Sequence, residues 1–233
     1  MRNFQKWMLG YGIILLSTLL IAHGGSRAVT VLAQNRPAER DVTVVIDPGH
    51  GGVDGGAISC TGIPESRFNL EISLRLNEMF RFLGYKTRMI RSEDISVYTE
   101  GETIARKKVS DLKQRLRMVE GTENPVLLSI HQNYFPQAQY SGAQTFYAAT
   151  SGSRDLAGAL QTAFNRYLDP VSPRQEKQSS GIYLMEHISC PAVLIECGFL
   201  SNPREEALLR NPDYQKKLSA LIACTAAEYL SNT

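Results

Sequence analysis

The apolar residues after position 41 follow two alternating patterns. Short apolar or β-branched runs predict buried strands, and between them apolar residues recur every three or four positions, which predicts amphipathic helices. The predicted strands cover residues 42–46, 85–90, 126–130, 143–149, 182–185 and 192–195. The predicted helices cover residues 66–83, 104–120 and 154–168, with one or two more over 204–230 that Pro212 would divide.

Alternating strands and helices predict a single α/β domain over residues 42–231, with a mostly parallel twisted sheet and helices on both faces. A polar linker, residues 34–41, precedes this domain. The helix over 104–120 is rich in Lys and Arg, and we expect its charged side chains to form a solvated face.

The first 33 residues have the pattern of an export segment. Arg2 and Lys6 precede an apolar run over residues 7–22, and small residues that would suit cleavage follow at 26–28 and 31–33. The run is short for a full membrane span, which needs about 20 residues. We therefore predict a signal peptide or an N-terminal membrane anchor, with the rest of the chain outside the cytoplasmic membrane, in the cell wall or held on that membrane's outer face.

Composition and charge exclude several classes of protein. Hydrophobic residues make up 43% and charged residues 21%, which excludes a mostly disordered chain, a collagen-like chain and a polytopic membrane protein. The formal charge is +2, from 25 basic and 23 acidic residues. Because residues 1–33 hold three basic residues and no acidic one, the remainder has 22 basic and 23 acidic residues and a net charge of −1. That balance gives no reason to expect nucleic-acid binding.

The four cysteines do not form a metal-binding or redox pair in sequence, because no C-x-x-C is present. Cys190 and Cys197 flank one predicted strand, which would hold them too far apart to bridge to each other. We expect the cysteines to be small buried hydrophobic residues.

Reactive side chains follow three of the predicted strands. His50 comes after strand 42–46, His131 after 126–130, and Glu196 after 192–195. Because the carboxyl ends of parallel strands meet at one edge of a sheet, we expect these side chains to lie close together.

Two histidines and one carboxylate are a common ligand set for catalytic zinc. Glu65 is the candidate third ligand, since it opens the helix behind the first strand and that helix begins at the same edge. Asp47 and Asp54 are candidates to accept the second ring N–H of a histidine ligand, although Asp47 before Pro-Gly is also a turn former.

Each candidate has a structural alternative. The histidines could be ordinary hydrogen-bonded residues, and Glu65 could be an acid that the helix dipole favours. The glycines over 51–56 could suggest a phosphate site, but G-x-G-x-x-G and G-K-[ST] are both missing. Glu196 ends an apolar strand, where its charge needs a nearby cation, so it could be a general base or a fourth metal ligand.

Several short motifs in this order resemble the zinc-dependent N-acetylmuramoyl-L-alanine amidases of the amidase type 3 family. They are VIDPGHGG at 45–52 with DGGA at 54–57, Glu65, SIHQN at 129–133, SGA at 141–143, and ECGFLSN at 196–202. The nearest likeness within the family is to the germination-specific spore-cortex amidases, which share the small size and GIYLM at 181–185. Two departures are Ser66, where the family commonly has Lys, and Tyr134, where it often has Ala.

The resemblance implies one Zn²⁺ per chain on His50, Glu65 and His131, with Glu196 as the catalytic base. It implies hydrolysis of the amide between the lactyl group of N-acetylmuramic acid and L-alanine in peptidoglycan. A role in spore cortex maturation, through muramic δ-lactam formation, would place the enzyme in the forespore intermembrane space. A lipoprotein activator is a further implied partner.

Asn133 and Arg115 are candidates for substrate binding or loop positioning, and the alternative for Arg115 is an ordinary surface charge on its helix. Two other functions stay open. One is a non-catalytic wall-binding or regulatory protein on an amidase fold, and the other is a zinc peptidase of different specificity.

Overall fold

The computed structural model describes residues 41–168 and 173–232. Contacts divide the chain into residues 1–39 and residues 40–233, and the fold described here is that of the second unit. The predicted signal peptide or anchor, residues 1–33, lies outside the described residues, as does the linker up to residue 40.

In the described part of the chain, six strands form one sheet in the order β2-β1-β3-β6-β4-β5. All neighbouring strands are parallel except β4 and β6, which are antiparallel. The strands are β1 (Thr43–Pro48), β2 (Lys86–Met89), β3 (Pro125–Asn133), β4 (Gln144–Tyr147), β5 (Lys177–Gln178) and β6 (Ala192–Phe199). The prediction of a mostly parallel sheet in a single α/β domain is confirmed.

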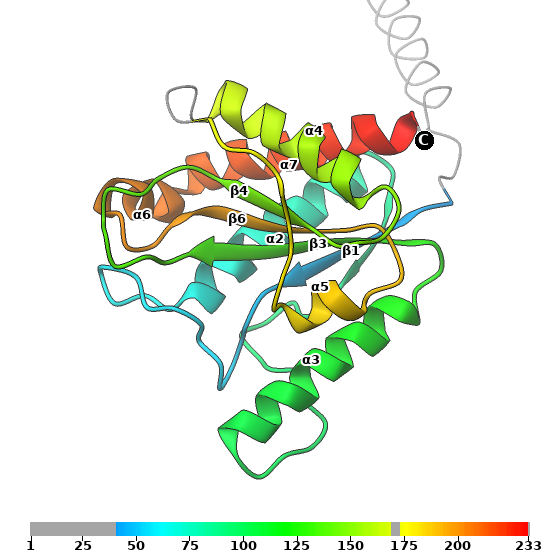
Figure 1. Ribbon diagram of the computed structural model, residues 1–233, viewed down its shortest axis with the longest axis horizontal. Coiled ribbons are helices and arrows are strands. Elements are labelled where there is room, and N and C mark those ends of the chain that lie inside the picture. Colours follow the sequence, from blue (N-terminus) through cyan, green and yellow to red (C-terminus); the bar gives the residue numbers. More distant parts are fainter. Residues whose placement is uncertain (1–40, 169–172, 233) are drawn as a thin grey trace, which may run out of the picture. The chain divides into compact units, whose positions relative to one another are not determined.

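Helices cover both faces of this sheet (Figure 1). One face packs against α2 (Glu65–Phe82), α4 (Ser153–Tyr167) and α7 (Pro212–Ser231), while α3 (Ile104–Glu120) and the short α5 (Tyr183–His187) lie on the other. The helix α6 (Pro203–Arg210) precedes α7. Pro212 begins α7, so the predicted division of the C-terminal helical region is confirmed.

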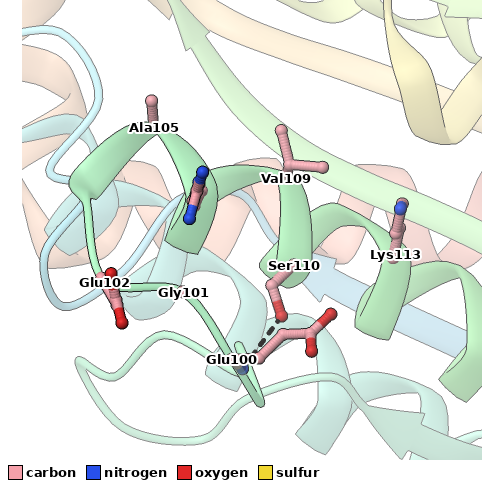
Figure 2. A pocket seen from close by; sticks show the side chains of 8 residues that line it. Glu100, Gly101, Glu102, Ala105, Val109, Ser110 and Lys113 are labelled. Carbon is pink, nitrogen blue, oxygen red and sulfur yellow. Dashed lines mark hydrogen bonds between the residues drawn. The ribbon is translucent and has the colours of Figure 1, made fainter.

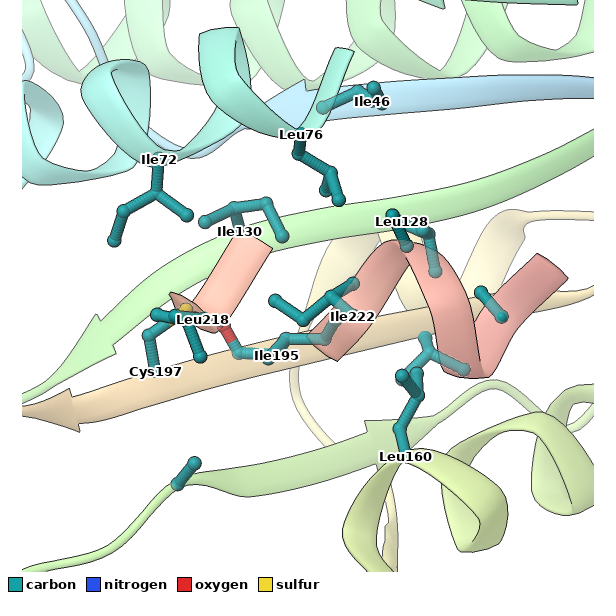
Figure 3. Close-up of a cluster of buried hydrophobic side chains, with 14 of the residues drawn as sticks. Ile46, Ile72, Leu76, Leu128, Ile130, Leu160, Ile195, Cys197, Leu218 and Ile222 are labelled. Atoms are coloured by element: carbon teal, nitrogen blue, oxygen red, sulfur yellow. Dashed lines mark hydrogen bonds between the residues drawn. The ribbon is translucent and has the colours of Figure 1, made fainter. Parts of the chain in front are cut away.

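Alternate residues of the central strands supply two separate hydrophobic cores. Val44 and Ile46 of β1 belong to the larger core with α2, α4 and α7, whereas Val45 belongs to a smaller core with α3 and α5. This division follows from the two-residue repeat of a strand. Figure 3 shows Ile72 of α2 and Ile222 of α7 among the side chains of the larger core.

Two of the strand assignments differ from the predictions. Residues 182–185 were expected to form a strand, but Tyr183–His187 is the helix α5, with Ile188 N–H donating to Leu184 carbonyl oxygen at 3.1 Å. An apolar run this short fits either structure, and its packing against α3 decides for the helix. The two-residue strand β5 was not predicted, because its Lys and Gln have no apolar pattern.

The cysteines are all free, and the expectation of burial holds for only two of them. Cys190, just before β6, and Cys197, within β6, are buried, whereas Cys60 and Cys224 are exposed. Cys60 lies in the loop before α2, and Cys224 lies on the outer side of α7. The local position of each residue, in a surface loop or on the outer side of a helix, therefore overrides the general tendency of cysteine to be buried.

Across residues 41–168 and 173–232, none of the helices is both long enough and apolar enough to cross a membrane.

The topology brings three strand ends together. In the sheet β1, β3 and β6 are consecutive and parallel, so their carboxyl ends lie side by side. The helix α2 returns antiparallel behind β1, so its N-terminus begins at the same edge. Any side chain that ends these strands or begins this helix is therefore close to the others.

Ile222 in the larger core and Ile104 at the exposed start of α3 form a matched pair for testing this packing, being 0% and 62% exposed. We expect Ile222→Ala to lower the free energy of unfolding by about 2–5 kcal/mol, because it leaves a cavity. Ile104→Ala should change it by less than about 0.5 kcal/mol. Urea denaturation measures both, and equal effects would contradict this description of the core.

Candidate active site

The loop between β1 and α2 holds His50 in a conformation that is uncommon for a residue with a side chain. The φ of His50 is 58°, in the left-handed region. Gly51 and Asp54 close a tight turn beyond it, with paired backbone hydrogen bonds of 2.7 and 3.1 Å. Such strain persists only where the surroundings hold it, which is common at functional sites.

His50, Glu65 and His131 converge at the edge of the sheet. One ligand atom from each lies within 4.8 Å of the other two. His50 Nε2 is 3.3 Å from Glu65 Oε2, and His131 Nδ1 is 3.0 Å from Glu65 Oε1. Two imidazole nitrogens and a carboxylate therefore face a common point, which is a donor set suited to zinc.

Two glycines make this close approach possible. A Cβ on Gly49 would lie 2.2 Å from His131 Nε2, and one on Gly56 would lie 2.6 Å from Glu65 Oε2. Gly56 also has a φ of 70°, which other residues rarely adopt. The glycines of this loop are thus required by the packing of the three converging side chains.

Glu65 is the first residue of α2 and is 4% exposed. Its Oε2 accepts from the backbone N–H of Ala57 at 3.1 Å. Its Oε1 accepts from the backbone N–H of Gln132 at 3.1 Å and from Asn69 Nδ2 at 3.2 Å. These donors come from the loop, from β3 and from the next turn of α2, so they fix the carboxylate in one orientation.

The first histidine is oriented from its other side. His50 Nδ1 donates to Asp54 Oδ2 at 3.0 Å, which leaves Nε2 directed at Glu65. Lys108 of α3 pairs with the second oxygen of Asp54 at 2.8 Å. Asp54 thus has the predicted place beside a histidine ring, an arrangement that is usual for metal-ligating histidine.

The pKa values of the converging groups are moved in opposite directions. Burial acts to lower the pKa of His50, but the Glu65 and Asp54 carboxylates outweigh it and raise the pKa to about 9. Burial acts to raise the pKa of Glu65, and the two histidines outweigh it and hold that pKa well below its usual range. The carboxylate of Glu65 is therefore ionised, and it stabilises positive charge beside it. That charge can be a protonated imidazole or, in its place, a bound cation.

Glu196 lies directly across from His131 in the pairing of β3 with β6. Its Oε2 is buried and has no hydrogen-bond partner among the residues that the structure describes. Burial raises the pKa of Glu196 to about 7. A carboxyl group with that pKa can both accept and donate a proton near neutral pH.

Arg115 is buried, which contradicts the alternative of an ordinary surface charge and the expectation that all charged residues of α3 form a solvated face. Its guanidinium pairs with Asp47 and Asp111, and it donates to the carbonyl oxygens of Pro48 at 2.9 Å and His50 at 2.6 Å. Burial is compensated by these acceptors. Arg115 therefore supports the backbone that presents His50.

Arg91 holds the same segment from the side of β2. It donates to the carbonyl oxygens of Pro48 at 2.9 Å, Gly49 at 3.0 Å and Ser66 at 2.9 Å. This arginine was not predicted as a site residue, and neither were Asn69 and Lys108. Only Asn69 left a signal in the sequence, since it lies one helical turn after Glu65.

Asp47 and Asn133 take different places. Asp47 is buried and accepts from Ser129 Oγ at 2.7 Å. Burial acts to raise its pKa, but Arg115, His131 and Ser129 together outweigh burial and lower that pKa. It supports the strand ends rather than a histidine ring. Asn133 ends β3 after a register shift that follows His131, and its carbonyl oxygen accepts from Leu200 N–H at 2.8 Å.

A cleft of about 260 Å³ opens beside the two histidines. His50 and His131 line one side of it, Lys108 and Arg115 of α3 another, and residues 181–185 a third. A separate hollow of about 470 Å³ lies between α3 and the loop before it, over residues 100–113 (Figure 2). That second hollow is lined by no histidine, so the smaller cleft is the one that serves the converging groups.

Comparison with known proteins agrees with this geometry. Residues 44–227 match the N-acetylmuramoyl-L-alanine amidase family, amidase type 3. The germination-specific N-acetylmuramoyl-L-alanine amidase of Bacillus subtilis is 37% identical over 181 residues, which are 77% of this chain and 76% of that protein.

Solved structures show the same fold. The CwlD amidase from Clostridioides difficile, determined in complex with the GerS lipoprotein, has a TM-score of 0.78 and 36% identity over 82% of this chain and 99% of that one. An N-acetylmuramoyl-L-alanine amidase from Clostridium difficile 630 has a TM-score of 0.72 and 31% identity over 83% and 99%. The chain belongs to the N-acetylmuramoyl-L-alanine amidase family of enzymes.

Proposed function

We propose that this amidase is zinc-dependent, with His50, Glu65 and His131 as ligands of one ion and Glu196 as the catalytic base. The observation that carries the proposal is the convergence of three ligand atoms within 4.8 Å. The donor set fits zinc, and Gly49 and Gly56 leave room for the ligands to approach one another. The buried Oε2 of Glu196, which has no hydrogen-bond partner within residues 41–168 and 173–232, provides a proton acceptor beside them.

Zinc held by these three side chains would supply Lewis-acid chemistry, lowering the pKa of water and stabilising the negative charge that develops on the carbonyl oxygen. Glu196 takes the proton of the attacking water at its carboxylate. It then gives that proton to the nitrogen of the leaving L-alanine, so the amide is cleaved and the glycan strand stays intact. A pKa near 7 suits both steps.

The cleft beside His50 and His131 is the proposed entry for the amide. Its walls combine Lys108 with apolar residues such as Leu184 and Met185, which suits a stem peptide that has both carboxylates and alanine methyl groups. Asn133, at the end of β3, remains a proposed substrate-binding residue. Arg115 acts on the same site through the backbone of His50, because its donors are used by protein oxygens.

The biological setting is proposed from the relatives. The Bacillus relative is a germination-specific amidase by name, and a solved relative was captured with a lipoprotein. We propose that the chain acts on spore cortex peptidoglycan, in the forespore intermembrane space, and that a lipoprotein can be its partner. Action outside the cytoplasmic membrane agrees with the export pattern of residues 1–33.

The main test is mass spectrometry of purified peptidoglycan after incubation with the zinc-loaded protein. We expect free stem peptides that begin at L-alanine. Glu196→Ala should reduce their release by about 10²–10⁴-fold while the variant still binds one zinc ion, because the base and the ligands are different groups. Glu78→Ala, an exposed glutamate of α2, is the matched control and should be fully active.

Three results would count against this assignment. Release by Glu196→Ala at the wild-type rate would remove Glu196 from the reaction. Loss of zinc from that variant would favour the fourth-ligand role instead. Release of amino acids from within the stem peptide would indicate a peptidase of another specificity.

The raised pKa of Glu196 also predicts a pH dependence of stability in chelator-treated protein. The folded chain holds this proton up to about pH 7, whereas a glutamate in the unfolded chain, with its ordinary pKa of 4.5, loses it earlier. The retained proton therefore contributes to the free energy of unfolding. This stabilisation is complete below pH 4.5 and is lost as the pH rises through 7. Glu196→Gln has no such proton to lose.

We therefore expect the free energy of unfolding of Glu196→Gln, relative to wild type, to increase by about 1–3 kcal/mol between pH 5 and pH 8. The raised pKa of His50 is present in both proteins and cancels in the difference. Denaturant melts at the two pH values measure this quantity. A difference that does not change with pH would mean that Glu196 is already ionised at pH 5.

The position of Arg115 predicts an effect on zinc affinity. Arg115→Lys keeps the charge, but one ammonium with three donors cannot replace the planar guanidinium that donates to Asp47, Asp111, Pro48 and His50 together. We expect zinc affinity to fall by about 10–100-fold in a chelator competition, as for other residues that orient a metal ligand. Arg117→Lys, on the exposed side of α3 with Gln114 as its partner, should bind zinc like wild type. Unchanged affinity in Arg115→Lys would contradict the positioning role.

A further inference from the structure

The loop that follows β3, residues 134–142, exposes three aromatic side chains. Tyr134, Phe135 and Tyr140 are 49%, 44% and 43% exposed. Single exposed apolar residues are ordinary on protein surfaces, but a group of aromatic residues in one loop marks a contact surface. We name this loop, residues 134–142, the aromatic loop.

The rings of the aromatic loop are arranged on a buried support. Phe135 and Tyr140 meet edge to face, with ring centroids 4.9 Å apart. Tyr140 also stacks on Phe199, the last residue of β6, at 6.3 Å. The guanidinium of Arg174 covers the ring of Phe199 at 5.0 Å. The exposed rings therefore rest on a fixed base at the end of the sheet.

The backbone of the aromatic loop is held by polar contacts. Phe135 N–H donates to Ser201 Oγ at 3.1 Å, and Asn202 Nδ2 donates to the carbonyl oxygen of Tyr140 at 3.1 Å. Gly142 N–H donates to Glu205 Oε1 at 2.8 Å. The loop is thus anchored along its length, and the edge-to-face rings of Phe135 and Tyr140 are still partly exposed to solvent. An anchored aromatic surface loses little entropy when a ligand binds to it.

The aromatic loop is continuous with the active site. Tyr134 comes three residues after His131, and Phe199 comes three residues after Glu196. Leu200 N–H donates to the carbonyl oxygen of Asn133, which joins the two segments where the strands end. At about 3.3 Å per residue, the aromatic loop begins roughly 10 Å from the catalytic groups. A polymer bound at the active site can therefore extend over it.

We propose that the aromatic loop is a saccharide subsite, in which Phe135 and Tyr140 contact a pyranose ring of the peptidoglycan glycan strand next to the reacting muramic acid. The proposal deepens the proposed function and rests on it. An amidase removes a side branch, so the glycan continues beyond the reacting sugar in both directions and remains available for contact. The apolar C–H face of a pyranose ring matches the face of an aromatic ring, and neither group needs a charge.

The test compares two substrates with the zinc-loaded, full-length protein. One substrate is polymeric peptidoglycan, and the other is a single N-acetylmuramic acid that carries its stem peptide. For Phe135→Ala with Tyr140→Ala, we expect KM on the polymer to rise about 10-fold with kcat unchanged, since each aromatic contact contributes a moderate part of the binding energy. Activity on the single sugar should be that of wild type.

Two variants serve as controls. Phe82→Ala removes an aromatic side chain that is 88% exposed at the far end of α2, and it should leave both activities unchanged. Tyr140→Phe keeps the ring without its hydroxyl group and should retain wild-type KM on the polymer.

The remaining outcomes separate this proposal from the proposed function. Equal losses on both substrates would mean that the aromatic loop supports the active site and does not bind sugar. If the double variant loses no activity on either substrate, the subsite proposal is wrong. The exposed rings would then be a surface for a protein partner.

If wild type cleaves neither substrate, the proposed function fails by itself. The subsite is then decided by calorimetric titration of soluble glycan strands without stem peptides, which should bind wild type about 10-fold more tightly than the double variant.

Discussion

The carboxylate of Glu65 is the group on which the site's architecture depends. It is nearly excluded from water, and an ionised group there is costly unless its oxygens are satisfied. Two histidines and three N–H donors satisfy them, and these come from the β1–α2 loop, from β3 and from α2 itself. The loop can approach this carboxylate only because Gly56 has no side chain. A single buried charge thus ties the loop, the strand and the helix to one another.

The sequence was enough to predict much of this arrangement, for a physical reason. Short apolar runs followed by His50, His131 and Glu196 define strand ends, and parallel strands share one edge. Predicting that these three side chains converge therefore required only the positions of the strands and helices, and not the detailed packing between them. Glu65 was harder to assign, because an acid at the start of a helix is common without any ligand role. The family resemblance supplied that choice, and the structure places its oxygens between both histidines.

The interior role of α3 could not be predicted in the same way. Lys108, Asp111 and Arg115 recur at helical spacing, which marks one face of the helix but not what lies opposite. That face meets the β1–α2 loop, so charges that the pattern placed in solvent instead hold Asp54, Asp47 and the backbone of His50. Residues 182–185 were misassigned for a related reason, since a short apolar run takes its structure from its neighbours. In both cases the deciding contacts are distant in sequence.

The two glutamates of the site have the same side chain, but their surroundings move their pKa values in opposite directions. Burial acts to raise the pKa of Glu65, but the two imidazoles that it faces outweigh burial, so its pKa is low and it is ionised near neutral pH. Burial raises the pKa of Glu196 to about 7, and its Oε2 has no hydrogen-bond partner in the described part of the chain. Carboxylates whose environments separate their pKa values in this way generally have separate acid–base roles. The sequence left Glu196 open as a ligand or a base, and this contrast in environment supports the base.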